Sequence, residues 1–199
     1  MKLVKGRYLL AIGAVVLVAA GCGGSTEGDA QPVGSTGVTS AAGGTSTTEG
    51  SIPENVPTGF DPCTDIPQEV LASEGFRSSS PSDGAGANGI KWQGCRWAQS
   101  DAYSASIRVT NITVEMVRDN NGRKIRDEYR IAGRDAIASN ADDEDNPRSV
   151  CTLHVSMNGG SLEFLLNNPP SNRKTGHIET CQLARTLAEK VVPHIPADA

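Results

Sequence analysis

The sequence predicts a small α+β domain, in which an antiparallel β-sheet carries an N-terminal and a C-terminal helix on one face and is held by two disulfides. Several central segments alternate apolar and polar residues, as half-exposed strands do. Segments with helical spacing precede and follow them. Four cysteines are spread over these segments. Helices at both ends of a run of strands favour a single sheet with helices packed against it.

The first 21 of the 199 residues have the pattern of a secretory signal peptide. Lys2, Lys5 and Arg7 form a positive region, and residues 8–20 are almost wholly apolar. A membrane-spanning helix needs about 20 apolar residues, so this run is too short to be a permanent anchor. We therefore expect residues 1–21 to be cleaved.

The stretch Ala19-Ala20-Gly21-Cys22 resembles the lipobox of bacterial lipoproteins, with Ala19 at the position that usually holds Leu. The resemblance implies that Cys22 becomes the first residue of the mature protein and carries diacylglycerol and acyl chains such as palmitate. Two or more acyl chains give stable anchoring. The resemblance places the protein on the extracytoplasmic face of the cell membrane. Ordinary signal cleavage, which would leave Cys22 as a free thiol, is the alternative.

Residues 22–58 read as a flexible tether that follows the lipid attachment point. They are rich in Gly, Ser and Thr, contain no aromatic residue and have no apolar period. A flexible chain of this length spans roughly 30–35 Å. The extracytoplasmic domain is expected over residues 59–199.

The element order begins with a short helix within residues 63–76, where Asp65 is the expected N-cap and Gly75 the end. Residues 78–89 are a loop by composition. We expect strands within 90–99 and 103–112, and a short helix within 113–122.

A further strand is predicted around residues 135–139, followed by a charged loop over 142–148. Residues 149–168 form the clearest hairpin, with a turn at Asn158-Gly159. His154 falls on its polar face. The last helix covers residues 179–192 and is stopped by Pro193.

The four cysteines of the domain, Cys63, Cys95, Cys151 and Cys181, form an even set outside the cytoplasm. This indicates two disulfides, and four cysteines allow three connectivities. The simplest arrangement fastens each helix to the sheet through the pairs Cys63–Cys95 and Cys151–Cys181. No CxxC spacing is present, which disfavours a zinc or thioredoxin-type site.

Three segments occur together in a fairly specific order: FDPCTDIPQEVLASEGF, GCRW and CQLARTLAEKVVPHIP. With the lipobox and the tether, they resemble an actinobacterial lipoprotein family catalogued only as a domain of unknown function, number 3558. The resemblance covers nearly all of residues 59–196. It implies the same location and architecture, and it leaves the activity open.

Composition argues against several classes of function. Loss of residues 1–21 removes three of the 18 basic side chains and no acid, which leaves 15 basic and 23 acidic side chains. Nucleic-acid binders show clustered basic surfaces, so we expect no nucleic-acid partner. GxSxG, HExxH and P-loop motifs are missing from the sequence, and its three histidines are far apart. The acidic run at residues 142–146 lacks the spacing of a calcium loop. We therefore expect no enzyme, no cofactor and no metal site.

Three residues are candidates for contact with a partner. Trp97 shares the strand parity of Cys95 and is the expected core tryptophan, whereas Trp92 has the opposite parity and is a candidate surface contact. Arg123 and Lys124 lie in the mixed-charge segment 118–130. That segment is usually a solvated face, and it is the first place to look for a partner surface.

These observations favour a monomeric, non-catalytic binding or interaction module held at the cell envelope by its N-terminal lipid. An envelope protein or a cell-wall component would be its partner. The alternatives are a carrier of a small apolar ligand, an envelope enzyme, and a passive surface protein with no dedicated ligand. Because the domain is small and poor in aromatic residues, we expect a filled core with no cleft.

Overall fold

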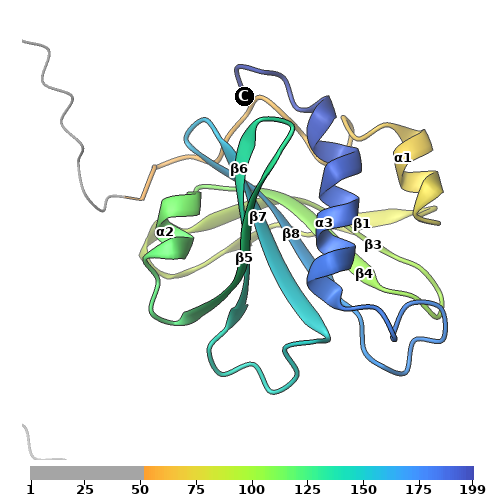
Figure 1. Cartoon of the computed structure of the whole chain (residues 1–199). Helices are drawn as coiled ribbons and strands as arrows, with labels where there is room; N and C mark the ends of the chain where they lie inside the picture. The colour runs from red at the N-terminus through yellow and green to blue at the C-terminus, as the bar shows by residue number, and fades with distance from the viewer. Residues whose placement is uncertain (1–51) are drawn as a thin grey trace, which may run out of the picture. The chain divides into compact units, whose positions relative to one another are not determined.

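The computed structural model describes residues 52–199, which form an α+β domain (Figure 1). The signal peptide, Cys22 and most of the tether lie outside the described residues. The elements are α1 Gln68–Ser73, β1 Ser79–Pro81, β2 Gly84–Ala85, η1 Ala87–Gly89, β3 Lys91–Ala98, β4 Ser104–Thr110, α2 Val114–Arg118, β5 Arg123–Ile131, β6 Arg134–Ala141, β7 Val150–Met157, β8 Gly160–Asn167, α3 Thr180–Val191 and η2 Val192–His194.

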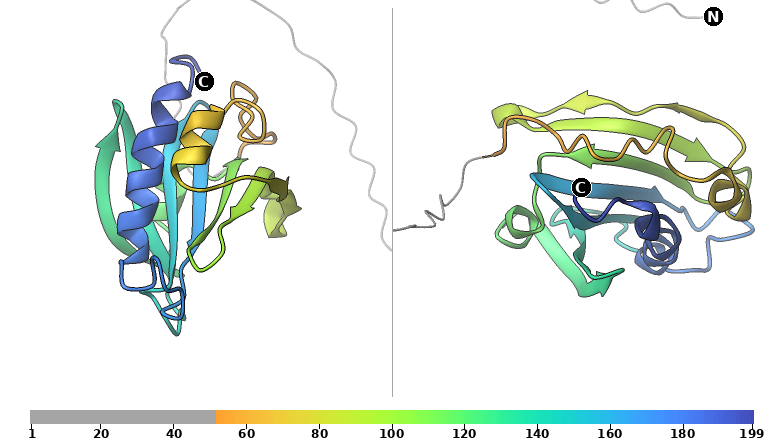
Figure 2. Two further views of the ribbon diagram at one scale, coloured as in Figure 1. Left: turned by 90° about the vertical axis from the view of Figure 1, so that its right-hand side faces the viewer. Right: turned by 90° about the horizontal axis from the view of Figure 1, so that it is seen from above.

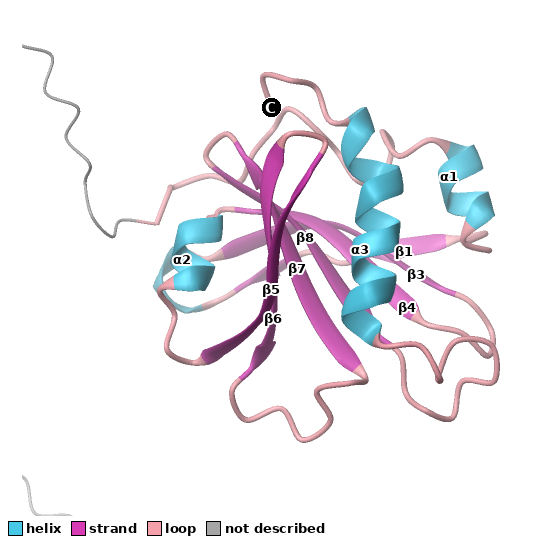
Figure 3. Ribbon diagram, in the orientation of Figure 1, coloured by secondary structure: helices cyan, strands magenta, loops and turns pink. Residues whose placement is uncertain are grey.

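All strands within residues 52–199 join one antiparallel sheet of eight strands, in the order β1-β3-β4-β8-β7-β6-β5, with β2 also paired to β3. The sheet is strongly twisted, so that β5 at one edge and β3 near the other run in very different directions (Figure 3). The predicted hairpin is confirmed as β7 and β8, where Gly159 takes the positive φ of 78° that the turn requires.

Helix α3 packs along one face of the sheet (Figure 2). Its buried residues recur at helical spacing, and Ala184, Leu187 and Val191 are fully inaccessible to solvent. Strands β7 and β8 form most of the sheet surface on which α3 packs, and the small residues Ala136 and Ala138 of β6 are buried in the same apolar core. Burial of Leu187 alone contributes about 1.5–3 kcal/mol.

The opposite face of the sheet carries helix α2. The helix begins at Thr113, whose side chain accepts a hydrogen bond from the backbone N–H of Met116. Its buried residues Val114 and Val117 pack on Ile137 of β6 in a second, small apolar cluster. The sheet therefore has helices on both faces, with α3 as the main cover.

Two disulfides fasten the outer segments to the sheet. Cys63, which precedes α1, is joined to Cys95 of β3, and Cys151 of β7 is joined to Cys181 in the first turn of α3. This is the pairing that the sequence predicts. Trp97 is buried beside Phe76, as its parity with Cys95 indicated.

The structure corrects several local predictions. Asp65 is not the N-cap of α1, because the helix begins later and the Asp65 carboxylate accepts a hydrogen bond from the backbone N–H of Asp61 instead. Part of the expected loop at 78–89 pairs with β3 as β1 and β2. No strand is expected in the mixed-charge segment 118–130, yet it contains most of the edge strand β5, whose residues are largely exposed, as expected of a solvated face.

None of the helices between residues 52 and 199 is long and apolar enough to cross a lipid bilayer.

Replacement of Cys151 and Cys181 together by alanine should lower the free energy of unfolding by about 3–4 kcal/mol, because the disulfide closes a loop of 30 residues in the unfolded chain. Urea unfolding followed by circular dichroism measures the change. The Cys63→Ala, Cys95→Ala double variant is the matched comparison, with a loop of 32 residues and an equal expected loss. A loss below about 1 kcal/mol for the first pair would contradict the structural role given to that bond.

Candidate functional site

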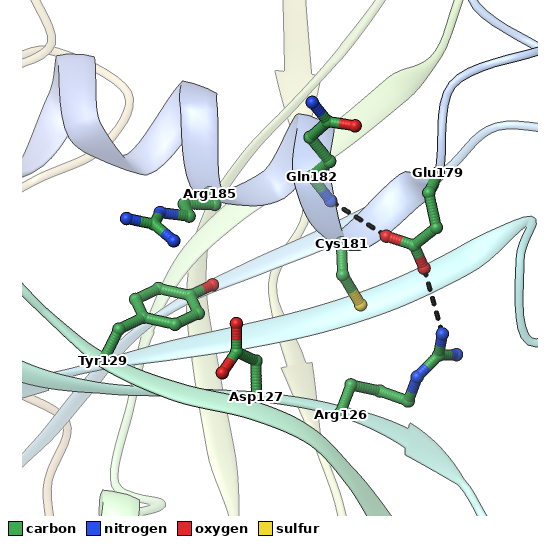
Figure 4. A pocket seen from close by; sticks show the side chains of 7 residues that line it. All are labelled: Arg126, Asp127, Tyr129, Glu179, Cys181, Gln182 and Arg185. Atoms are coloured by element: carbon green, nitrogen blue, oxygen red, sulfur yellow. Dashed lines mark hydrogen bonds and ion pairs between the residues drawn. The ribbon is translucent and has the colours of Figure 1, made fainter.

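An open cavity of about 230 Å³ lies between strand β5 and the N-terminal half of α3 (Figure 4). It contradicts the expectation that the domain has no cleft. The residues that line it come from β5, from the residue that precedes α3, and from the first turns of that helix. They are Arg126, Asp127, Tyr129, Glu179, Cys181, Gln182 and Arg185.

A break in the register of β5 builds the strand side of the cavity. Ile125 pairs with Ser139 and Asp127 with Ala138, so Arg126 is the extra residue of a β-bulge. Consecutive residues of a regular strand point to opposite faces. Here the bulge lets Arg126 and Asp127 both reach the α3 side, where Figure 4 shows them around the same cavity.

The two arginines of the cavity are held by ion pairs. Arg126 donates to the carboxylate of Glu179 at 3.2 Å and to the side-chain oxygen of Asn140 at 2.8 Å. Glu179 also caps α3 by accepting from the backbone N–H of Gln182 at 3.0 Å. Arg185 donates from Nε to Glu189 at 2.8 Å. The guanidinium carbon of Arg185 lies 4.8 Å from the ring centroid of Tyr129, a cation–π contact.

The hydroxyl group of Tyr129 is buried and has no hydrogen-bond partner among the described residues. Figure 4 shows it beside the Asp127 carboxylate, pointing into the space that the labelled side chains enclose. Burial, reinforced by the negative charge of Asp127, raises the pKa of Tyr129 to about 12. The hydroxyl therefore keeps its proton at neutral pH. An unpaired buried polar group costs free energy, so this one calls for an explanation.

The Asp127 carboxylate is the second group of the cavity that is left without a full set of partners. One of its oxygens accepts the backbone N–H of Glu128 at 2.9 Å, and it has no ion pair within residues 52–199. The cavity thus offers one free carboxylate oxygen at its surface, and the unpaired hydroxyl of Tyr129 is buried in its wall.

A second polar group of residues lies on the sheet face opposite α3, centred on Glu163. The Trp92 indole donates to one oxygen of this carboxylate at 3.0 Å, and Arg108 donates from Nε to the other at 3.0 Å. Glu163 is 4% exposed. The Arg108 guanidinium also lies 5.4 Å from the centroid of the Trp92 ring. Arg123 comes to the same face from β5 and donates to the hydroxyl of Ser139 at 2.8 Å.

His154 and Ser161 stand beside Glu163 in an arrangement that resembles a catalytic triad. The Nδ1 atom of His154 is 3.0 Å from the Ser161 hydroxyl, and Nε2 is 3.7 Å from the Glu163 carboxylate. Burial lowers the pKa of His154 to about 4, against the opposing effect of Glu163. The imidazole is therefore neutral at pH 7.

The proton positions and the burial of this group argue against nucleophilic catalysis. The Ser161 hydroxyl donates to the backbone oxygen of Ile112 at 2.6 Å, so His154 must donate to Ser161 and is not placed to take its proton. Ser161 is 0% exposed and His154 is 2% exposed. A substrate has no path to either atom, and we assign the group to packing of the polar sheet face.

The sequence candidates fall in different places. Trp92 and Arg123 both reach the polar face around Glu163, whereas Lys124 is exposed on β5. The segment 118–130, named as the first place to look for a partner surface, supplies Arg126, Asp127 and Tyr129 to the cavity. The residues of α3 and its N-cap that complete the cavity were not identified from the sequence. Their contribution depends on where the helix docks.

Among residues 52–199, no group of three or more His, Cys, Asp or Glu side chains could hold a metal ion. The acidic residues at 142–146 lie in a loop between β6 and β7.

The buried neutral state of His154 predicts a specific loss of stability in mild acid. The unfolded chain takes up this proton near pH 6.5 and the folded chain only near pH 4, so stability is highest above pH 6.5 and falls as the pH drops towards 4. The His154→Gln variant should lose up to about 3 kcal/mol less than the wild type over this range. Urea unfolding at a series of pH values measures the slopes.

His177→Gln is the control for that measurement, because it removes an exposed imidazole instead of the buried one. Equal slopes for wild type and His154→Gln would show that His154 is not buried as a neutral ring.

One of the comparisons with known proteins finds a match, that with protein-family models. No curated protein and no solved structure matches the chain. The model of a family described as "Protein of unknown function (DUF3558)" matches residues 17–194, which covers the entire sheet and all three α-helices. The chain therefore belongs to the DUF3558 family of proteins of unknown function.

Proposed function

We propose that the protein is a lipid-anchored, extracytoplasmic binding module that holds a ligand at the cell envelope without changing it chemically. Cys22 would carry the lipid, and the domain would bind through the cavity between β5 and α3. The observation that carries the binding function is the buried, unpartnered hydroxyl of Tyr129 in that cavity.

The surroundings of Tyr129 suit binding. Arg126 and Glu179 are joined by an ion pair, and Glu179 also caps a helix that a disulfide fixes to the sheet, so the walls of the cavity are held in a fixed geometry. Preorganised sites lose less conformational entropy when a ligand binds.

The same surroundings do not suit catalysis. Among the described residues, no histidine lines the cavity, and the sulfur atom of Cys181 is committed to a disulfide. The raised pKa of Tyr129 leaves the hydroxyl protonated and a weak base and nucleophile at neutral pH.

The location of the proposed function is supported by three separate features of the chain. The charge and length of residues 1–21 fit a cleaved signal, and Cys22 stands at the lipobox position. The two disulfides, Cys63–Cys95 and Cys151–Cys181, fit an oxidising compartment outside the cytoplasm.

A carrier of a small apolar ligand is the second candidate, because a larger open cavity of about 460 Å³ lies beside β3. Pro57, Phe60 and Val109 contribute to its lining. Phe60 and Val109 are 2% and 3% exposed, so little of their apolar surface is left for a ligand. Asp61 and Asp83 stand at the same cavity and make it a poor apolar site. We therefore favour the cavity at Tyr129.

The anchor predicts a clear partition experiment. In a host that processes lipoproteins, the full chain should move into the detergent phase on Triton X-114 phase separation, and the Cys22→Ala variant should stay in the aqueous phase or remain unprocessed. The neighbouring Gly23→Ala variant is the matched control and should behave as the wild type. Globomycin, which blocks the lipoprotein signal peptidase, should lead to accumulation of the precursor. A Cys22→Ala variant that partitions and is processed as the wild type would contradict the lipid anchor.

A further inference from the structure

Two groups of the cavity between β5 and α3, Asp127 and Arg185, keep free hydrogen-bonding atoms, and of these two only Asp127 lacks an ion pair within residues 52–199. Arg126 is paired with Glu179, and this pair uses both carboxylate oxygens together with the helix cap. Asp127 keeps one free oxygen and no ion pair among the described residues. Arg185 is bound to Glu189 through Nε alone, and its two terminal nitrogens make no hydrogen bond within residues 52–199.

These free groups have opposite hydrogen-bonding roles. The carboxylate of Asp127 accepts, the terminal nitrogens of Arg185 donate, and the Tyr129 hydroxyl does both. Figure 4 shows the Arg185 guanidinium over the ring of Tyr129 and the Asp127 carboxylate beside its hydroxyl. A ligand that fits must therefore present donors at one end and acceptors at the other.

The size of the cavity limits the ligand further. At about 230 Å³ it is smaller than the range of roughly 300–1,000 Å³ found for sites of drug-sized molecules. Because both complementary groups lie in this one small space, the donor and acceptor ends of the ligand must lie close together.

We propose that the cavity binds a small zwitterion of the α-amino acid class, with its ammonium group on Asp127 and its carboxylate on Arg185 and the hydroxyl of Tyr129. The inference rests on the proposed binding function and assigns a ligand class to it. The Tyr129 hydroxyl is closed to solvent in the free chain, so binding must displace the half-exposed Arg185 side chain that lies over the Tyr129 ring. The O–H then donates to the ligand carboxylate, which removes the unpaired buried group. Charge-assisted hydrogen bonds at both ends distinguish the zwitterion from molecules that carry only one of its charges.

Because Arg126 and Arg185 are both paired with glutamates, the cavity disfavours a ligand that carries only a negative charge. Each arginine shares its charge with a glutamate, so the free carboxylate of Asp127 is the excess charge of the group. A ligand with a carboxylate alone would bring a second negative charge next to Asp127. The ammonium group of a zwitterion neutralises it.

The test compares three related probes, L-alanine, L-alaninamide and N-acetyl-L-alanine, on the full chain purified in detergent. Saturation-transfer difference NMR detects weak binding, and titration gives the affinities. L-alanine should bind about tenfold or more tightly than either derivative, since each derivative lacks one charge-assisted contact. Asp127→Asn and Arg185→Gln should each weaken binding of L-alanine by about tenfold.

Two variants keep the result interpretable. Asp135→Asn is the matched control, because Asp135 is exposed on β6 outside the cavity, and it should bind as the wild type. Tyr129→Phe should weaken binding, yet the Tm of the free chain should stay equal or rise because an unpaired buried hydroxyl is removed. A lower Tm together with unchanged binding would overturn the role given to Tyr129.

Different results overturn the proposed ligand class and the proposed binding function. Equal binding of L-alanine and one of its derivatives, or no binding of L-alanine, overturns the zwitterion. A fragment library screened on the same sample then decides the binding function separately. Fragments whose signals are lost in Tyr129→Phe would keep the cavity as a binding site for another ligand class. A screen without such fragments would overturn both proposals.

Discussion

The disulfide between Cys151 and Cys181 is the constraint on which both the fold and the candidate site depend. It joins the middle of the sheet to the first turn of α3 and so fixes where along β7 the helix begins. Once the helix is held there, it packs on β7 and β8, and its residues Ala184, Leu187 and Val191 are closed to solvent. The same attachment holds the N-cap Glu179 within reach of Arg126 and places Arg185 over the ring of Tyr129. The cavity is thus a consequence of how α3 is docked.

The two faces of the sheet bury different kinds of side chain. The α3 face is apolar and forms the core, whereas the opposite face buries a charged group around Glu163 with Arg108 and Trp92 as its partners. Burial of a carboxylate is tolerated only when its oxygens are paired, and here both are. The neighbouring His154 and Ser161 are residue types that occur in catalytic triads. However, the Ser161 hydroxyl donates to the backbone oxygen of Ile112 and accepts from His154, and both side chains are closed to a substrate. The candidate site is therefore the cavity at Tyr129 on the α3 face, and not the group around His154 on the opposite face.

Much of the fold could be predicted because its signals are local. An Asn-Gly turn marks the β7–β8 hairpin, helical spacing marks α3, and the cysteine count together with the expected elements predicts both disulfides. Strand β5 escaped prediction because an edge strand carries charges on both faces and a bulge at Arg126 breaks its alternation. The site could be predicted only in part. The mixed charges of segment 118–130 predict a partner surface there, but Tyr129 meets Arg185, a residue 56 positions later, only through tertiary packing. No pattern in the sequence reports an unpaired hydroxyl.

The most direct test of this account follows Tyr129 itself. In the full chain with ¹³C at the ζ carbon of tyrosine, addition of L-alanine should shift the Tyr129 signal, because its hydroxyl gains a hydrogen-bond partner. Tyr103 serves as an internal reference, since it is buried elsewhere and its hydroxyl already donates to Glu74. The account predicts a saturable shift at Tyr129 and none at Tyr103. An unchanged Tyr129 signal, or equal shifts at both tyrosines, would contradict it.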